Sequence, residues 1–180
     1  ELEIEKEKEI EIDIKKDYDA TKHEAYKALT VKQPYADDLV KAAYKDIDGN
    51  VYGVKSIEVR SKPTQYRGRI LICSSKKPVI PGKENGCIMG FVELYDIKRV
   101  EDFTPEDWDK TRIPRSKRAE IKTGYGWLMR NPVQCVELPV RGQLGIYNVA
   151  FDKGDIVEYP RVCKVSREDW ELLQKTDTNV

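Results

Sequence analysis

The apolar residues of this chain occur in short runs, and each run ends at Gly, Pro or a group of charged residues. Residues 69–73 and 146–151 are examples of such runs. Runs this short, bounded by turn-forming residues, favour β-strands over long helices. No run approaches the roughly 18 apolar residues of a membrane-spanning helix. We therefore expect a soluble protein that has no membrane partner.

Most of the expected elements are strands. Strands are predicted over residues 54–60, 69–73, 87–97, 127–129, 133–138, 146–151 and 162–165. Short helices are predicted over 35–44, from Thr104 onwards, and from Ser166 to Leu173, and the last two start at a residue that can cap a helix. This pattern predicts a mainly β or α+β fold, a curled sheet or small β-barrel with short helices at its ends.

Overall composition excludes few classes of function, and the local distribution of charge is more informative. The chain has 180 residues, of which 36% are charged, well above the average of roughly 25%. Its 32 basic residues balance its 32 Asp and Glu residues, so any argument for a polyanionic partner must rest on local charge. The four cysteines lack C-x-x-C spacing and His23 is the single histidine, so we expect no metal site.

Familiar catalytic motifs are absent from the sequence. It has no Gly-x-Ser-x-Gly, no phosphate-binding Gly-rich loop ending in Gly-Lys-Ser/Thr and no His-Glu-x-x-His, and we expect no cofactor. The Glu-rich N-terminus lacks the cationic and apolar regions of a signal peptide. Because the cysteines have apolar flanks, we interpret them as buried thiols of a cytoplasmic protein.

The first 19 residues differ from the rest in charge. They contain nine acidic residues and four lysines, and the apolar residues among them fall on even positions. Alternation of this kind predicts an edge strand, whereas the lysines that interrupt its apolar face favour a solvated tail. Both interpretations stay open. We divide the chain into an acidic extension (1–24), a central domain (25–150) and a C-terminal hairpin and helix packed on that domain (151–180).

A basic stretch lies between residues 55 and 77, where seven cations accompany one acid, Glu58. The cations are Lys55, Arg60, Lys62, Arg67, Arg69, Lys76 and Lys77. A basic segment that includes an aromatic residue, here Tyr66, suits a phosphate backbone. A solvated strand face with a charged loop is the alternative.

The spacing Gly53-x-Lys55-x-x-Glu58-x-Arg60 is a more specific pattern. On a strand, Glu58 and Arg60 point to the same face, and Lys55 points to the other face unless the backbone bends at the start of the strand. The carboxylate and the guanidinium form either a structural ion pair or a polar recognition pair for a base and a phosphate.

Six segments in this order resemble the ASCH domain family. They are Leu29-Thr-Val-Lys-Gln-Pro-Tyr-Ala36, Gly53-Val-Lys-Ser-Ile-Glu-Val-Arg60, Tyr66-Arg-Gly-Arg-Ile-Leu-Ile-Cys-Ser-Ser-Lys76, residues 86–93, Tyr125-Gly-Trp127 and Pro139-Val-Arg-Gly-Gln-Leu-Gly-Ile-Tyr-Asn148. The resemblance implies a β-barrel related to the PUA fold, with a basic cleft. Family members are thought to act on RNA or nucleotides.

The resemblance also implies which residues line that cleft. By their match to the family motifs, the candidates are Lys32, Gln33, Lys55, Glu58, Arg60, Ser74, Ser75, Lys76 and Trp127. The chain departs from the family at Tyr35 and Tyr147, where Trp is common. Residues 46–52 and 115–123 resemble insertions. These departures affect the mouth of the cleft and therefore the size of its ligand.

Three functions follow from these residues. The first is binding of RNA, another single-stranded nucleic acid, or a nucleoside or nucleotide. Trp127 would stack on a base, Glu58 would read its edge and the cations would hold phosphate. The second is a small hydrolase that acts on RNA or, as an amidohydrolase, on a modified nucleoside, with Lys55 and Glu58 as the catalytic candidates. The resemblance weakens the second, because deacetylating members carry Thr at the position of Glu58.

The third function is a protein-interaction domain whose acidic extension pairs with another chain as an edge strand. Binding that does not depend on salt would favour this function, whereas binding to RNA that weakens with salt would favour the first.

Overall fold

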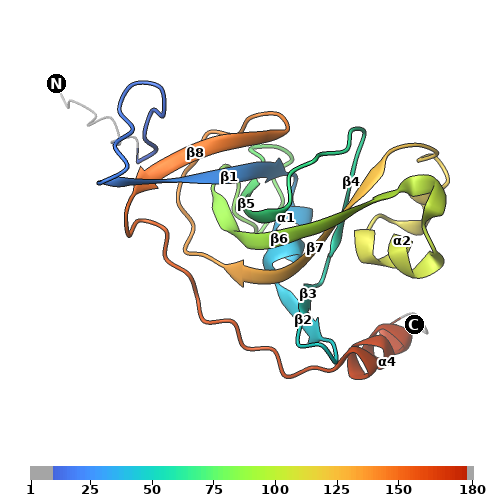
Figure 1. The fold of residues 1–180 in the computed structure, drawn as a ribbon. Helices are drawn as coiled ribbons and strands as arrows, with labels where there is room; N and C mark the ends of the chain where they lie inside the picture. Colours follow the sequence, from blue (N-terminus) through green and yellow to red (C-terminus); the bar gives the residue numbers. More distant parts are fainter. Residues whose placement is uncertain (1–9, 178–180) are drawn as a thin grey trace.

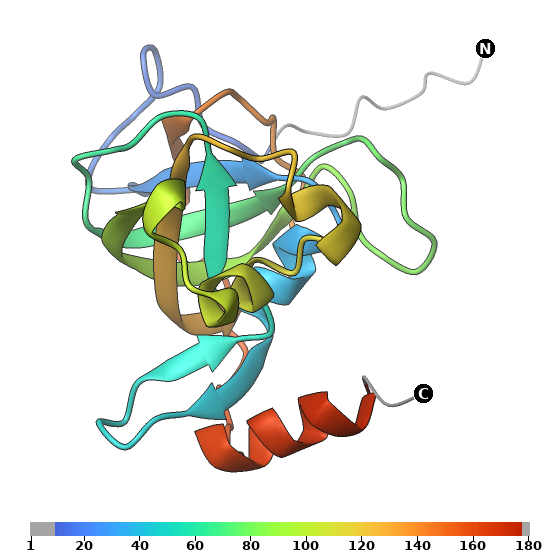
Figure 2. The ribbon, with the colours of Figure 1, turned by 90° about the vertical axis from the view of Figure 1, so that its right-hand side faces the viewer.

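A curled six-stranded sheet forms the body of the molecule. The computed structural model describes residues 10–177, and within them the strand order of this sheet is β4-β7-β6-β5-β1-β8 (Figures 1 and 2). The strands are β1 (His23–Val31), β4 (Ile57–Arg60), β5 (Gly68–Ser74), β6 (Ile88–Arg99), β7 (Tyr125–Gln134) and β8 (Ile146–Asp152). With the short helices, this sheet confirms the predicted mainly β or α+β fold class and its barrel-like curl.

The central strand β5 is buried on both faces, which explains its uninterrupted apolar run. Ile70 and Ile72 point into a core cluster on the side of the first helix, α1 (Tyr35–Val40). Leu71 and Cys73 point into a second cluster on the opposite face, with Phe91. The curled sheet is therefore covered on both of its faces.

Strand β1 is a central element that the sequence did not predict. It pairs in parallel with β5, for example Val31 with Ser74, and antiparallel with β8, for example Ala28 with Tyr147. Only its second half is buried, and the exposed first half carries charged residues. The apolar pattern in this strand is consequently too short to be recognised without its neighbours.

The helix predicted over 35–44 ends earlier, because the following residues form a hairpin. Residues Ala42–Lys45 are strand β2, and they pair antiparallel with β3 (Val51–Gly53). The predicted turn at 48–50 joins the two strands, and the segment 46–52 that resembles an insertion is the end of this hairpin. Figure 2 shows it projecting from the sheet towards the last helix, α4 (Arg167–Asp177).

The helix predicted from Thr104 is confirmed. Helix α2 (Pro105–Thr111) follows a 3₁₀ turn (Val100–Asp102). The Thr104 hydroxyl accepts a hydrogen bond from the backbone N–H of Asp107, and the Asp107 carboxylate accepts one from the backbone N–H of Thr104. This is the reciprocal capping that the sequence indicated. A further short helix, α3 (Arg115–Arg118), follows in the second segment that resembles an insertion.

Two predicted strands are wrong. Residues 133–138 are not a separate strand, because β7 runs through to Gln134. Residues 162–165 form no strand, so the structure contains no C-terminal hairpin; among the described residues after β8, the chain makes isolated bridges and then α4. The segment meets β2 only at its end, where the backbone N–H of Lys45 bonds to the carbonyl of Val165 and Lys45 forms an isolated parallel bridge with Ser166.

The acidic extension is described only from residue 10 onwards. Ile12 makes a single antiparallel bridge to Ala150, on the outer edge of β8. Residues 14–17 form a turn in place of the predicted edge strand, and residues 1–9 lie outside the described residues. None of the helices described is long and apolar enough to cross a membrane.

Candidate functional site

Lys55 lies inside the protein, although lysine is among the residues least often buried. Only 1% of its surface is exposed. Its Nζ donates to the carbonyl oxygen of Thr111 at 2.7 Å and lies 3.2 Å from Oε1 of Glu58. The ammonium also faces the ring of Tyr35, 4.8 Å from its centroid. A buried cation is therefore balanced by one carboxylate, one carbonyl and one aromatic face.

Glu58 connects this lysine to Arg60. Its Oε2 accepts a bond from Nη2 of Arg60 at 2.9 Å, and the same Nη2 donates to the carbonyl oxygen of Thr30 at 2.9 Å. Side-chain exposure rises from 11% at Glu58 to 28% at Arg60. We call these three residues, Lys55, Glu58 and Arg60, the Lys55 cluster. It runs from the interior to the surface.

A bend before β4 brings the three side chains together. Lys55 precedes the regular strand, so its side chain joins Glu58 and Arg60 on one face, as a bend at the strand start allows. Gly53 permits the bend, because a Cβ there would lie 2.7 Å from the carbonyl oxygen of Leu39. The backbone N–H of Lys55 bonds to the carbonyl of Asp38 in α1, and that of Ser56 bonds to the carbonyl of Lys110 in α2.

Burial lowers the pKa of Lys55, and Glu58 partly opposes this effect. Desolvation disfavours the charged ammonium, whereas the nearby carboxylate favours it. A lysine with a lowered pKa beside a carboxylate is typical of functional sites as well as of structural ion pairs. In this cluster both carboxylate oxygens are already bonded to cations, which favours the structural ion pair.

Gln33 and Ser74 are also buried, and they bond within the protein. The Gln33 amide donates to the carbonyl of Glu84 at 2.7 Å and accepts from the backbone N–H of Asp37 at 3.0 Å. The Ser74 hydroxyl lies 3.3 Å from both the N and the O of Cys87. These two side chains anchor the loop between β5 and β6.

Trp127 packs in the core and does not present a stacking surface. It is 4% exposed and belongs to the cluster around Leu29 and Ile72. Its indole N–H donates to the carbonyl of Lys62 at 3.1 Å. The base-stacking role predicted for Trp127 does not fit this position, because the ring packs in the core.

Lys32 and Lys76 remain at the surface. They follow the paired ends of β1 and β5, where the N–H of Ser75 bonds to the carbonyl of Val31 at 2.9 Å. Arg60 reaches the same end of β1 through Thr30. We call Lys32, Arg60 and Lys76 the basic rim. Ser75, the remaining predicted residue, lies half-buried between the two strands' ends.

The sequence did not predict the partners of the Lys55 cluster. Thr111 and Thr30 act through backbone carbonyls, which carry no signal in side-chain type, and Tyr35 contributes a ring face. The part of the chain that the structure describes contains no group of three or more His, Cys, Asp or Glu residues that could hold a metal ion.

Comparison with known proteins agrees with this fold. The family model of the ASCH domain matches residues 29–133. Among solved structures, the chain is similar to the ASCH protein from Zymomonas mobilis, with 13% sequence identity and a TM-score of 0.51 over 83% of this chain and 93% of that one. Two mutants of that protein give similar values. One has 13% identity and a TM-score of 0.51 over 83% of this chain and 96% of that one. The other has 12% identity and a TM-score of 0.50 over 83% of this chain and 94% of that one. No curated protein matches.

Proposed function

The chain belongs to the ASCH domain family, which is generally thought to bind RNA, and on that premise we propose that it binds single-stranded RNA at the basic rim. Lys32 and Lys76 contact the phosphates from the ends of β1 and β5. Arg60 contributes the exposed part of its guanidinium between them. Phosphate contacts of this kind supply most of the affinity for a flexible strand.

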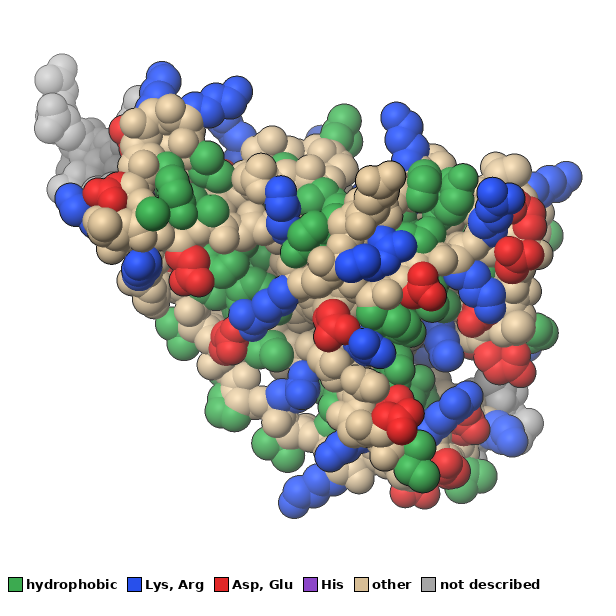
Figure 3. Space-filling model, in the orientation of Figure 1, with side chains coloured by type: hydrophobic (Ala, Val, Ile, Leu, Met, Phe, Trp, Pro, Cys, Tyr) green, Lys and Arg blue, Asp and Glu red, His purple; other side chains and the backbone are tan. Residues whose placement is uncertain are grey.

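The main support for this proposal is that the two lysines of the basic rim have no acidic partner among the described residues. Neither Lys32 nor Lys76 forms an ion pair with any described residue, and both are exposed. The basic residues on the face seen in Figure 3 are mostly interspersed with acidic ones. Two unpaired lysines beside a partly paired arginine therefore form a local site for phosphate.

The Lys55 cluster supports the rim from below. Glu58 holds the guanidinium of Arg60, and Lys55 holds Glu58. A guanidinium fixed by two protein acceptors loses less conformational entropy when a phosphate binds to its remaining donors. In this proposal Glu58 positions Arg60 and does not read a base.

Fluorescence anisotropy with a labelled single-stranded RNA tests the proposal. The double variant Lys32→Gln/Lys76→Gln should bind more weakly, and the slope of log K against log salt should become shallower by about 0.7 for each lost phosphate contact. Lys27→Gln is the matched control, because Lys27 is an exposed lysine further back on β1. Equal affinity and equal slope in the double variant and the control would exclude the rim.

The lowered pKa of Lys55 favours a second candidate function, the small hydrolase of the sequence analysis. A lysine with a lowered pKa loses its proton more readily than a solvated lysine, and beside a carboxylate it can take part in proton transfer. Mass spectrometry of acetylated cytidine after incubation with the protein tests it, with Lys55→Met as the variant. Conversion by the wild type that is lost in Lys55→Met would establish this function, and absence of any product would end it.

A further inference from the structure

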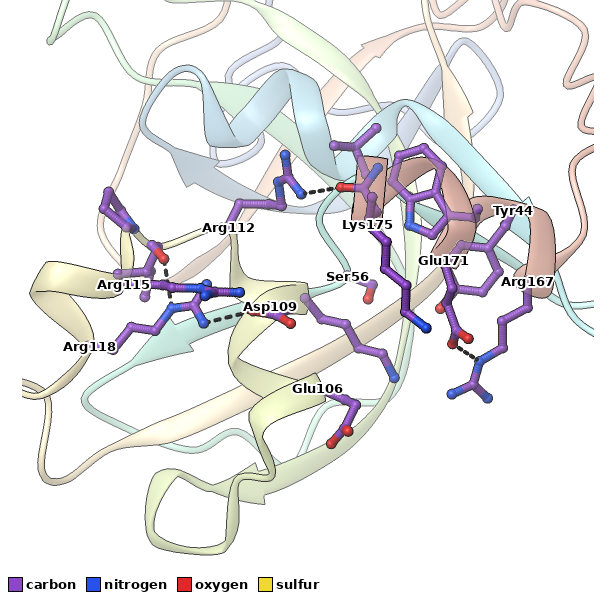
Figure 4. Close-up of a pocket in the computed structure, with 17 residues that line it drawn as sticks. Tyr44, Ser56, Glu106, Asp109, Arg112, Arg115, Arg118, Arg167, Glu171 and Lys175 are labelled. Atoms are coloured by element: carbon purple, nitrogen blue, oxygen red, sulfur yellow. Dashed lines mark hydrogen bonds and ion pairs between the residues drawn. The ribbon is translucent and has the colours of Figure 1, made fainter. Parts of the chain in front are cut away.

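A groove of about 850 Å³ lies between α2–α3 and α4, and no residue of the basic rim lines it. Figure 4 shows arginines of the α2–α3 segment on one side and Arg167 and Glu171 of α4 on the other. Ser56 lines the groove whereas Lys55 does not. The volume is in the range of sites that bind small organic ligands. Helix α4 lies outside the residues that the family model matches.

The groove has an excess of positive charge. Two of its cations are neutralised, since Arg118 pairs with Asp109 and Arg167 with Glu171. Three others, Lys110, Arg112 and Arg115, form no ion pair with any residue that the structure describes. These three come from adjacent turns at the end of α2 and the start of α3.

Lys110 is the most informative of these cations, because it is half-buried. Burial and the nearby Arg167 lower the pKa of its ammonium. A solvated surface lysine would have neither effect. An anion bound beside Lys110 would restore the favourable environment of the charged form.

The groove also has an aromatic wall. Trp170 of α4 lines it and is half-buried. The Trp170 ring contacts Tyr44, which also lines the groove, with 6.3 Å between ring centroids and an angle of 30° between the planes. An indole held in this way can stack on a planar base, and base stacking on an aromatic side chain contributes about 1–3 kcal/mol.

Local contacts hold α4 in position across the groove. The backbone N–H of Lys45 bonds to the carbonyl of Val165 at 2.9 Å, and the Ser166 hydroxyl caps α4 by accepting from the N–H of Asp169 at 3.1 Å. On the other wall, Arg112 donates to the side-chain oxygen of Gln174 at 3.2 Å. The two walls are therefore joined at one end of the groove.

We propose that this groove binds a nucleotide, with its phosphates on Lys110, Arg112 and Arg115 and its base against Trp170. Phosphate supplies the anion that the three cations lack. The base supplies a flat partner for the indole. The nucleotide is either free or part of a single strand, and the site does not depend on the basic rim.

Calorimetric titration with ADP, and separately with a short oligouridylate, tests this proposal on the full chain. The variant Lys110→Gln/Arg115→Gln should bind at least about tenfold more weakly, because charge-assisted hydrogen bonds are lost. Lys117→Gln is the matched control, since Lys117 lies on α3 with Arg115 but does not line the groove. Circular dichroism confirms that each variant is folded.

Tryptophan fluorescence locates the base. Binding should quench the emission of the wild type, and Trp170→Phe should remove that quenching while Trp108 and Trp127 still emit. Quenching that persists in Trp170→Phe would contradict the stacking role and with it the proposal.

The rim variant separates the two proposals. Lys32→Gln/Lys76→Gln should leave ADP binding unchanged. If ADP binds and its affinity depends on the groove residues, the ligand is a free nucleotide. If only the oligouridylate binds in this way, the ligand is a single strand. If neither ADP nor the oligouridylate binds, or if their affinities depend on the basic rim and not on the groove, this inference is overturned. RNA binding at the basic rim would then remain as the single proposal.

Discussion

At the scale of single residues, Lys55 shows why a position in a family motif need not be a surface contact. A buried ammonium is tolerated only when its charge and its hydrogen bonds are matched. Glu58, Thr111 and Tyr35 provide that match here. The side chain consequently serves first to fix Glu58, and Glu58 fixes Arg60.

The lowered pKa of Lys55 predicts a pH dependence of stability. Above this lowered pKa and up to the ordinary value of 10.5, the unfolded chain binds more protons at this residue than the folded chain. The free energy of unfolding should therefore rise with pH there, relative to the Lys55→Met variant. Urea denaturation of both proteins at a series of alkaline pH values measures the difference. If the free energies of unfolding of the two proteins change in parallel with pH, the pKa of Lys55 is not lowered.

At neutral pH the same variant should be less stable by about 3 kcal/mol, because Glu58 keeps only Arg60 as a partner. Lys62→Met, at an exposed lysine just beyond β4, is the control. Equal midpoints in urea for the two variants would mean that Lys55 adds no stability.

The cysteines give a prediction of chemical reactivity. Burial raises the pKa of Cys73 and of Cys135 to about 12, and Cys87 is buried as well. Cys163 is partly exposed. A thiol reagent at neutral pH should modify Cys163 quickly and the other three only on unfolding. Rapid modification of a second thiol in the folded protein, located by peptide mass spectrometry, would contradict this burial.

At the scale of elements, the helix ends are the features that the sequence determined most directly. Thr104 and Asp107 form their reciprocal bonds within four residues of the chain, so the pattern needs no distant partner. Strand β1 is the opposite case. Its residues form a strand because β5 and β8 lie on either side of it.

The cap of α2 has a measurable energy. Thr104→Ala should destabilise the protein by about 1 kcal/mol, because the N–H of Asp107 loses its acceptor. Ser116→Ala, which removes an exposed hydroxyl from α3, should change the unfolding midpoint much less. Thermal unfolding of both variants measures the comparison, and equal midpoints would mean that the cap contributes no stability.

At the scale of the whole molecule, Arg60 joins parts of the sheet that are not hydrogen-bonded neighbours. In the strand order, β7, β6 and β5 separate β4 from β1, yet Arg60 of β4 donates to Thr30 of β1. The curl of the sheet brings these strands together, and the side chain bridges the seam between them. The position of the basic rim depends on this closure.

Hydrogen exchange should reveal the effect of that bridge. In Arg60→Met the amides of β4 should exchange faster, whereas those in the centre of β5 and β6 should keep their protection. Arg67→Met, at an exposed arginine in the loop after β4, is the control. Unchanged protection of β4 in Arg60→Met would show that the seam stays closed without the guanidinium.

The sequence by itself determined strands β4, β5, β6 and β8, the turn at 48–50, the cap of α2 and the order of family motifs, because these depend on neighbouring residues. It also placed Glu58 and Arg60 on one face of a strand, and it left the direction of Lys55 to a bend at the start of that strand. Tertiary structure decided that Lys55 and Trp127 are buried, that β1 is a strand and that α4 forms a groove with α2 and α3. Burial and the assembly of walls depend on residues that are distant in the chain, and a pattern read along one segment carries no information about them.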